Sequence, residues 1–148
     1  MIHSLKKVET AQDWENLHRI RKSILFTGEI LPQNYDENHP QDRAENNSPI
    51  LFVFDNETIG VARLDQRDAT GIIRLVAITK EWQSQGKGRI LQELLEEKAR
   101  QLGIKTLCVN AANAAIGFYE KTGWIYNVWD KSELLDMAGS AVQMQKGI

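Results

Sequence analysis

The sequence predicts an α+β fold, in which a mixed, mostly antiparallel sheet of about seven strands carries helices on both faces. Three apolar runs in the middle of the chain are joined by turns so short that neighbouring strands must be antiparallel. A strand–helix–strand unit follows them and adds a parallel pair to the same sheet. Further apolar runs of strand type open and close the chain. Together these observations favour a sheet covered by helices over a helical bundle or a closed barrel.

The N-terminal part of the chain predicts a strand followed by a helix. Residues 2–9 alternate loosely between polar and apolar side chains, as a strand does. Residues 11–25 carry apolar side chains at helical spacing, and Thr10 with Asp13 forms a capping-box pattern at the start. A helix is therefore expected over 11–25.

Residues 29–49 are polar and rich in proline and asparagine. Such a composition is typical of a loop, here with one short helix expected near residues 43–46. A long loop beside a rigid sheet is where substrate contacts commonly lie. We therefore expect this segment to shelter a substrate.

The middle of the chain predicts three consecutive strands, a glycine-bearing loop over 80–88 and a long amphipathic helix over 89–102. The strands are 50–55, 58–66 and 72–79. Gly103 stands where a helix commonly ends.

The C-terminal part predicts three further strands around one short helix. The strands are 105–111, 124–129 and 141–145, the helix is 113–122, and residues 131–139 are expected to form a loop.

Composition narrows the function classes. Hydrophobic residues make up 42% of the 148 residues and charged residues 26%, values that are typical of a globular domain. No repeat or linker divides the chain, so residues 1–148 are interpreted as a single domain. The net charge of −2 argues against a nucleic-acid partner held by phosphate neutralisation.

Targeting signals are also weak. No apolar run approaches the roughly 20 residues of a membrane helix, and no signal peptide is visible. Cys108 is the one cysteine, which excludes an internal disulfide and favours a reducing compartment. We therefore expect a cytoplasmic protein without a membrane partner.

The loop between residues 83 and 89 has the features of an anion-binding cradle. Helix N-termini present unpaired amide groups and the positive end of the dipole. Gly86 and Gly88 let the backbone approach a phosphate closely, and Lys87 and Arg89 add positive charge. The spacing fits neither the P-loop nor the dinucleotide-binding fingerprint. The alternative is an ordinary solvated helix start.

In its context this loop resembles the acyl-CoA-binding signature of the GNAT superfamily of N-acetyltransferases, Q/R-x-x-G-x-G/A. Gln83, Gly86 and Gly88 stand at the matching positions. The preceding residues 74–82 resemble the strand and the R-V-A-V-x-x-E-[YW] lead-in of that family.

A second stretch supports the same resemblance. Residues 109–111 and 115–124 resemble the family pattern L-N-A-x-x-x-A-x-x-F-Y-E-K-x-G-F. The ending Met144-x-Lys146 resembles that of one small bacterial branch.

The resemblance implies an acetyl-CoA-dependent N-acetyltransferase that moves an acetyl group to a small-molecule primary amine by direct attack. In such folds the pantetheine arm pairs with the exposed backbone of the cofactor strand, and the pyrophosphate lies on the loop amides. A strand amide near Val76 or Ile78 would polarise the thioester carbonyl. The cofactor-binding residues implied are Val76, Ala77, Ile78, Gln83, Ser84, Gln85, Gly86, Lys87, Gly88, Arg89 and Asn113.

Tyr119 matches the family tyrosine that protonates the leaving thiolate. A phenol suits this role because its pKa near 10 keeps it protonated at neutral pH. The alternative is that the Phe118-Tyr119 pair serves packing alone.

Two positions depart from the family pattern. Ala112 stands where an Asn or Gln usually holds the pantetheine, and Asn113 or Asn110 is the candidate replacement. The strand 72–79 contains no acid that could act as general base, and Asp65 or His39 would be substitutes from elsewhere. Without a base, the attacking amine is expected to arrive neutral.

The remaining charged residues have two interpretations. Arg63 and Arg74 either pair with Asp65 or Glu57, or recognise a carboxylate on the substrate. The basic cluster at residues 19–22 is interpreted as a solvated face.

Other residues point to structure rather than chemistry. The histidines show no metal-ligand spacing, so no metal is expected. The tryptophans are expected in the core or a pocket wall, and Cys108 in a buried strand. A non-catalytic acyl-CoA-binding regulatory module and a protein N-acetyltransferase remain open as alternatives, as does a homodimer.

Overall fold

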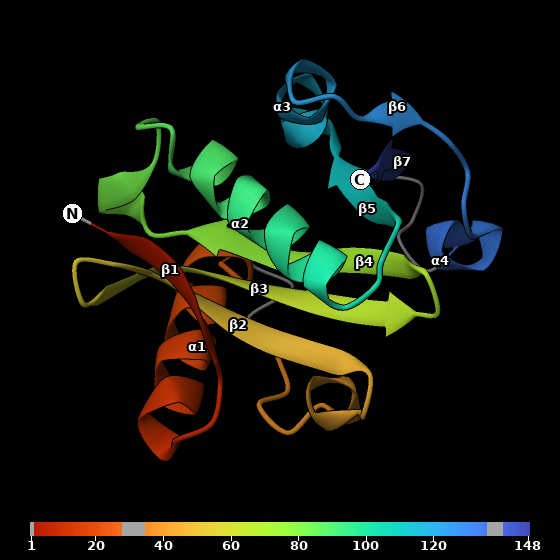
Figure 1. The fold of residues 1–148 in the computed structure, drawn as a ribbon. Coiled ribbons are helices and arrows are strands. Elements are labelled where there is room, and N and C mark those ends of the chain that lie inside the picture. Colours follow the sequence, from red (N-terminus) through yellow and green to blue (C-terminus); the bar gives the residue numbers. More distant parts are fainter. Residues whose placement is uncertain (1, 28–34, 136–140) are drawn as a thin grey trace.

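The computed structural model describes residues 2–27, 35–135 and 141–148, which form one seven-stranded sheet in the order β1-β2-β3-β4-β5-β7-β6 (Figure 1). The strands are β1 (His3–Lys7), β2 (Asn47–Phe54), β3 (Glu57–Arg67), β4 (Thr70–Ile78), β5 (Thr106–Ala112), β6 (Ile125–Tyr126) and β7 (Ala141–Gly147). Within the described ranges, β4 and β5 are parallel and the other neighbouring pairs are antiparallel. The predicted mixed, mostly antiparallel sheet is confirmed.

Helices lie on both faces of this sheet, as the sequence predicts. They are α1 (Ala11–Ile24), α2 (Lys87–Gln101), α3 (Ile116–Lys121) and α4 (Lys131–Leu135), with short 3₁₀ turns at Pro40–Arg43, Lys80–Trp82 and Asn113–Ala115. The capping box of α1 forms: Thr10 and Asp13 satisfy each other's backbone amides.

The alternation of side chains along β2 explains why two helices are needed. Leu51 faces α1 and packs with Leu17 and Ile20. Its neighbours Ile50 and Phe52 face the other way, toward α2. Both faces of the strand are apolar, so each must be covered.

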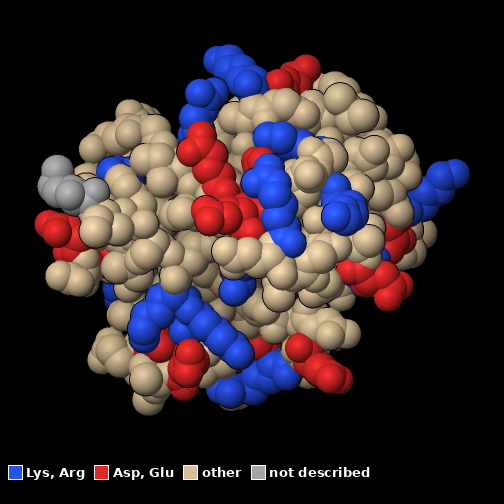
Figure 2. Space-filling model, in the orientation of Figure 1, with Lys and Arg blue, Asp and Glu red and all other residues tan. Residues whose placement is uncertain are grey.

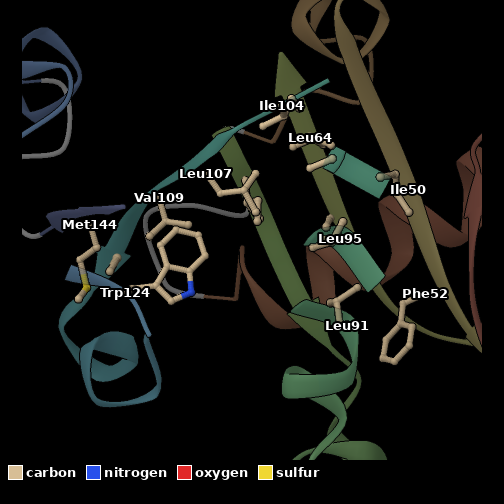
Figure 3. Packing of buried hydrophobic residues seen from close by; sticks show 14 of the residues in the cluster. Ile50, Phe52, Leu64, Leu91, Leu95, Ile104, Leu107, Val109, Trp124 and Met144 are labelled. Atoms are coloured by element: carbon tan, nitrogen blue, oxygen red, sulfur yellow. The ribbon is translucent and has the colours of Figure 1, made fainter. Parts of the chain in front are cut away.

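The larger core lies under α2 and continues to the far end of the sheet (Figure 3). Leu91 and Leu95 of α2 pack on the central strands, and Trp124 packs near Val109 and Met144 (Figure 3). Trp124 is 3% exposed, which confirms its expected place in the core.

Two helix positions differ from the expectation. The short helix near residues 43–46 lies instead at Pro40–Arg43, because Pro40 supplies the φ angle that suits a first helical position. Helix α2 begins at Lys87 rather than at residue 89, because Gly86 serves as its N-cap in a left-handed conformation.

The segment after Trp124 also differs. The strand expected over 124–129 is short because Gln143 Oε1 accepts the amides of Trp129 and Asp130, which ends the backbone pairing. The predicted loop 131–139 contains α4, whose start is capped by the Asp130 side chain accepting the amide of Ser132. Residues 136–139 of that predicted loop lie outside the described residues.

The surface carries both signs of charge. Lys and Arg side chains are interspersed with Asp and Glu on the face shown in Figure 2. Across the parts of the chain that the structure describes, no helix combines the length and apolar character needed to cross a membrane.

Candidate functional site

The site begins where the two parallel strands separate. Residues Thr70–Ile73 of β4 pair with Thr106–Val109 of β5. Beyond Ile73 and Val109, the described residues of these two strands are no longer paired with each other. β4 nevertheless runs on to Ile78. The sheet therefore has an open edge in its interior.

A β-bulge at Leu75 produces this separation. Val61 pairs with Ala77 whereas Arg63 pairs with Arg74, so two residues of β4 face one of β3. Leu75 has φ +54°, a left-handed conformation that costs a non-glycine residue roughly 1–2 kcal/mol. The strain is held by the surrounding sheet, and it turns the rest of β4 away from β5.

The amides of β4 beyond the bulge face the open edge. The Thr79 amide donates to the Ile59 carbonyl on β3 at 2.9 Å. Because amides alternate between the two edges of a strand, those of Ile78 and Val76 point toward the gap. Val76 also lines the adjacent cavity, and Ile78 does not. Of the two expected oxyanion donors, the geometry favours Val76, while Ala77 packs in the core beside α1.

The cavity beside this edge has a volume of about 630 Å³. One wall is apolar and comes from the separated strands and the start of α3, including Leu75, Val76, Ala111 and Ala115. Tyr119 also lines it. A second, polar wall comes from α1, residues 35–42 and the strands β3, β4 and β5. Its polar lining residues are Arg21, Tyr35, Asp36, His39, Asp42, Arg63, Arg74 and Asn110.

The glycine loop is braced by its two glutamines. The Gln83 side chain donates to the Ile78 carbonyl at 2.8 Å, and the Gln85 side chain donates to the Glu81 carbonyl at 2.7 Å. Ser84 between them has φ +61°. These contacts tie the loop to the end of β4.

The start of α2 presents free amides. The Ile90 amide donates to the Gly86 carbonyl at 3.4 Å, which is the first bond of the helix. The amides of Lys87, Gly88 and Arg89 precede it and have no partner within the described residues. Gly86 has φ +76°, and the space beside its Cα is open to a distance of 4 Å. This end of the helix can therefore receive an anion.

The two basic side chains of the loop are placed differently. Arg89 is exposed at the helix start. Lys87 is buried, with its Nζ 3.8 Å from the Phe54 ring centroid and 2.8 Å from His3 Nε2. Desolvation, with the Lys87 charge, lowers the His3 pKa, so the ring is neutral and its Nε2 accepts a hydrogen bond from the lysine ammonium. The Lys87 side chain therefore anchors the loop to β1 and β2, and its expected role beside an anion stays a prediction.

Tyr119 combines packing with access to the cavity. Its ring packs edge-on against Trp124 at 5.1 Å between centroids, and the residue lines the cavity. Burial raises the pKa of Tyr119 to about 12. The phenol is therefore protonated at neutral pH.

The expected amide partners for a pantetheine arm remain predictions. Asn110 donates to Glu133 and accepts from Gln143, so its side chain is already occupied. Asn113 is exposed beyond the end of β5, and Ala112 lines the cavity.

An alternating chain of charges borders the polar wall. Asp42 accepts from Arg21 at 2.8 Å and from Arg63 at 3.1 Å. Asp65 links Arg63 to Arg74. The predicted pairing of both arginines with Asp65 is confirmed, whereas Glu57 accepts from Trp82 instead.

The two ends of this series of charged side chains, Arg21 and Glu133, were not predicted from the sequence. Arg21 is 1% exposed, so the prediction of a solvated face over residues 19–22 is wrong at this position. Glu133 accepts a bidentate contact from Arg74, with bonds of 2.7 and 2.9 Å. The partners lie 21 and 59 residues apart, and no local pattern reveals such pairs.

The two base candidates from the sequence are poorly placed for that role. Both Asp65 oxygens accept from arginines. His39 Nδ1 accepts the Gln41 amide, which leaves the proton of the neutral ring on Nε2. Within the described residues, no group of three His, Cys, Asp or Glu side chains is arranged to hold a metal ion.

A family profile and the sequence of a bacterial relative both match this chain and point to the same protein family. Residues 25–146 match the family profile of the acetyltransferase (GNAT) domain. The uncharacterized N-acetyltransferase YjcF of Bacillus subtilis (strain 168) is 32% identical over 135 residues, which cover 89% of this chain and 95% of that protein.

Solved structures share the fold. The PaiA N-acetyltransferase of Thermoplasma acidophilum, in complex with coenzyme A, aligns with a TM-score of 0.75 at 15% identity and covers 100% of both chains. Escherichia coli ElaA aligns with a TM-score of 0.74 at 17% identity, over 98% of this chain and 99% of that one.

Proposed function

Because the chain belongs to the GNAT acetyltransferase family, we propose that it transfers the acetyl group of acetyl-CoA to the primary amine of a small molecule by direct attack. The observation that carries this proposal is the open edge of β4, which borders a cavity lined by Tyr119. Residues 1–148 would act as a single acetyltransferase domain.

The structure offers a cradle that fits the cofactor. The open β4 edge beyond Leu75 can pair with the pantetheine amides as an added strand would. The free amides of residues 87–89 suit the pyrophosphate, with Arg89 beside them. The structural relative PaiA in complex with coenzyme A supports this assignment. When bound, acetyl-CoA supplies an activated thioester.

The residues around the gap then have separate tasks. The Val76 amide would donate to the carbonyl oxygen as negative charge develops there. Tyr119 would donate its proton to the departing sulfur. Burial raises the pKa of the Cys108 thiol in the same sheet to about 11, which shows how exclusion of water affects a thiol here. A departing thiolate shielded from water would likewise be a stronger base. A protonated phenol at this point is therefore chemically suited to the transfer.

The cavity favours a small acceptor over a protein chain. Its volume of about 630 Å³ lies in the range of small-molecule sites. The buried Arg21–Asp42 pair, in which both side chains are nearly inaccessible, forms part of its polar wall. We infer that the acceptor enters as a compact amine whose polar groups meet this wall.

Tyr119→Phe tests the chemistry directly. The ring and its contact with Trp124 remain, and the transferable proton is lost. General acid help is typically worth about 10²–10⁴-fold, so turnover should fall by that factor while acetyl-CoA affinity stays nearly unchanged. Free thiol released with a panel of amines measures turnover, and calorimetry measures affinity.

Full turnover in Tyr119→Phe would return this residue to packing alone. Cofactor binding without turnover of any amine by the unaltered protein would favour the non-catalytic acyl-CoA-binding module.

A further inference from the structure

Beyond the proposed function, on which this inference rests, we propose that Tyr35 and His18 form the proton acceptor for the substrate amine. An alkylamine is an ammonium ion at neutral pH, and it must lose a proton before or during attack. The cofactor strand offers no acid for this purpose. The polar wall of the cavity provides a different solution.

Tyr35 connects the cavity to a buried histidine. It lines the cavity, and its Oη lies 2.5 Å from His18 Nδ1 and 3.4 Å from Arg21 Nη1. His18 lies on α1, is 6% exposed and stacks on Trp14. Because the guanidinium can only donate, the Tyr35 oxygen accepts from Arg21 and its own proton points to His18 Nδ1. The hydroxyl is thus oriented as a relay.

The other polar groups of the wall are less suitable. The arginines cannot accept a proton. Asp42 already accepts three hydrogen bonds from arginines. His39 presents a ring whose acceptor nitrogen is occupied. Asp36 is the remaining competitor: it is exposed, and its Oδ1 accepts the Asn38 amide.

The surroundings keep His18 ready to accept. Desolvation by burial lowers the pKa of His18, and the Arg21 and Lys22 charges lower it further, while Glu37 and Asp42 oppose this. Burial raises the pKa of Tyr35. At neutral pH the imidazole is therefore unprotonated and the phenol protonated, which is the starting state that a relay needs.

The step balances as a coupled transfer. The ammonium N–H bond breaks and its proton passes to Tyr35 Oη, while the tyrosine's own proton passes to His18 Nδ1. The freed nitrogen lone pair forms the bond to the thioester carbonyl carbon. The C–S bond breaks, and the departing sulfur takes the proton of Tyr119. The nitrogen, now bonded to the acyl carbon, gives up its second proton to the Tyr119 phenolate through solvent, which leaves a neutral amide and restores the phenol. The His18 imidazolium then returns its proton to solvent.

The pH profile distinguishes this relay from a neutral incoming amine. In the unaltered protein, turnover should rise through a pKa below 6.5 and then stay level, whatever the pKa of the amine. In Tyr35→Phe and His18→Asn, turnover at pH 7 should fall by roughly 10²-fold or more and should rise with pH toward the amine's own pKa. The double variant should be no slower than either single variant, because both residues serve one path.

His18→Asn separates proton transfer from positioning. Asparagine places an acceptor near the position of Nδ1 and can hold the Tyr35 hydroxyl, but it cannot take the proton. Tyr126→Phe, an exposed tyrosine outside the cavity, is the matched control and should behave as the unaltered protein does. Thermal melts of each variant establish that it folds.

A measurement without turnover checks the contact itself. In the NMR titration of His18, Tyr35→Phe should shift the imidazole pKa and the Nδ1 resonance. Level pH profiles in both variants would overturn the relay, as would an amine-dependent profile that Asp36→Asn alone produces. If Tyr119→Phe loses turnover while the Tyr35 and His18 variants do not, the proposed function stands and the relay fails. No turnover in the unaltered protein would overturn both.

Discussion

The two parts of the proposed site are built differently. The proposed cofactor end uses backbone groups: the bulge at Leu75 and the open edge of β4 beside the cavity, and the amides after Gly86, whose residues do not line the cavity. The acceptor end uses side chains, with Arg21, Asp42 and their partners joined from distant parts of the chain. Backbone features serve a cosubstrate that is the same for many enzymes, whereas side-chain networks can be changed to suit one acceptor. Stability and cofactor binding should therefore respond separately to substitutions at the two ends.

Asp42→Ala should give the largest effect, and it should act on stability. Asp42 is 3% exposed and holds two buried guanidinium groups. Breaking a buried ion pair from one side typically costs about 3–5 kcal/mol, because the remaining charge is left without a partner. Urea unfolding followed by circular dichroism should show a loss of this size in the free energy of unfolding.

Glu37→Ala is the matched control for Asp42. Glu37 pairs with Lys22, and both side chains are about half exposed. Solvent screens such an exposed pair, so it adds little to stability and this variant should unfold nearly as the unaltered protein does. Equal losses in the two variants would show that the acceptor end is not a special structural unit.

The difference between the two ends also explains what could be predicted from the sequence. The seven strands, α1, α2 and the cofactor loop follow from periodicity and from motifs that are continuous in the chain. The Arg21–Asp42 pair joins α1 to a 3₁₀ turn across a polar segment without periodicity, so nothing local marks it. The bulge at Leu75 is likewise hidden, because a leucine gives no signal for a left-handed conformation.

The side chain of Lys87 is a third feature that could not be predicted from the sequence. The motif places a cation beside the anion cradle, but the side chain points to Phe54 and His3 instead. A motif predicts the path of the backbone. The long lysine side chain is then placed by its contacts with the aromatic rings of β1 and β2.

Gly88→Asp should act on cofactor binding and leave stability unchanged or slightly higher. A Cβ at Gly88 meets Phe118 at 3.6 Å, an ordinary contact. A carboxylate in the first helical turn is favourable for the helix dipole, but it repels a phosphate at the same amides. Like charges about 4 Å apart cost about 4 kcal/mol at an effective dielectric constant of 20, and solvent reduces this, so acetyl-CoA affinity should fall roughly hundredfold.

Gly88→Ala separates charge from volume at this position. The methyl group has room, so affinity should change little. Calorimetry of both variants with acetyl-CoA measures the difference. Similar affinities in Gly88→Asp and the unaltered protein would place the phosphates elsewhere on the protein.

Glu133→Gln should give the smallest effect, and its signature is the pH dependence of stability. Burial alone would raise the pKa of Glu133, but hydrogen bonds from Arg74, Asn110 and Arg67 outweigh it and hold the pKa below its usual value of 4.5. A carboxyl with a depressed pKa stabilises the fold above its unfolded pKa, and this contribution is lost as pH falls through the folded pKa. The variant should therefore be less stable than the unaltered protein by about 1 kcal/mol above pH 4.5, because the pair is partly open to solvent. The two unfolding curves should converge at lower pH.

Glu120→Gln is the control, because Glu120 lies at an exposed helix position without an ion pair in the described residues. The stability of this variant should follow that of the unaltered protein at every pH. A gap between Glu133→Gln and the unaltered protein that persists unchanged below the folded pKa would mean that the glutamine disturbs packing rather than charge, and that the alternating chain ends at Arg74.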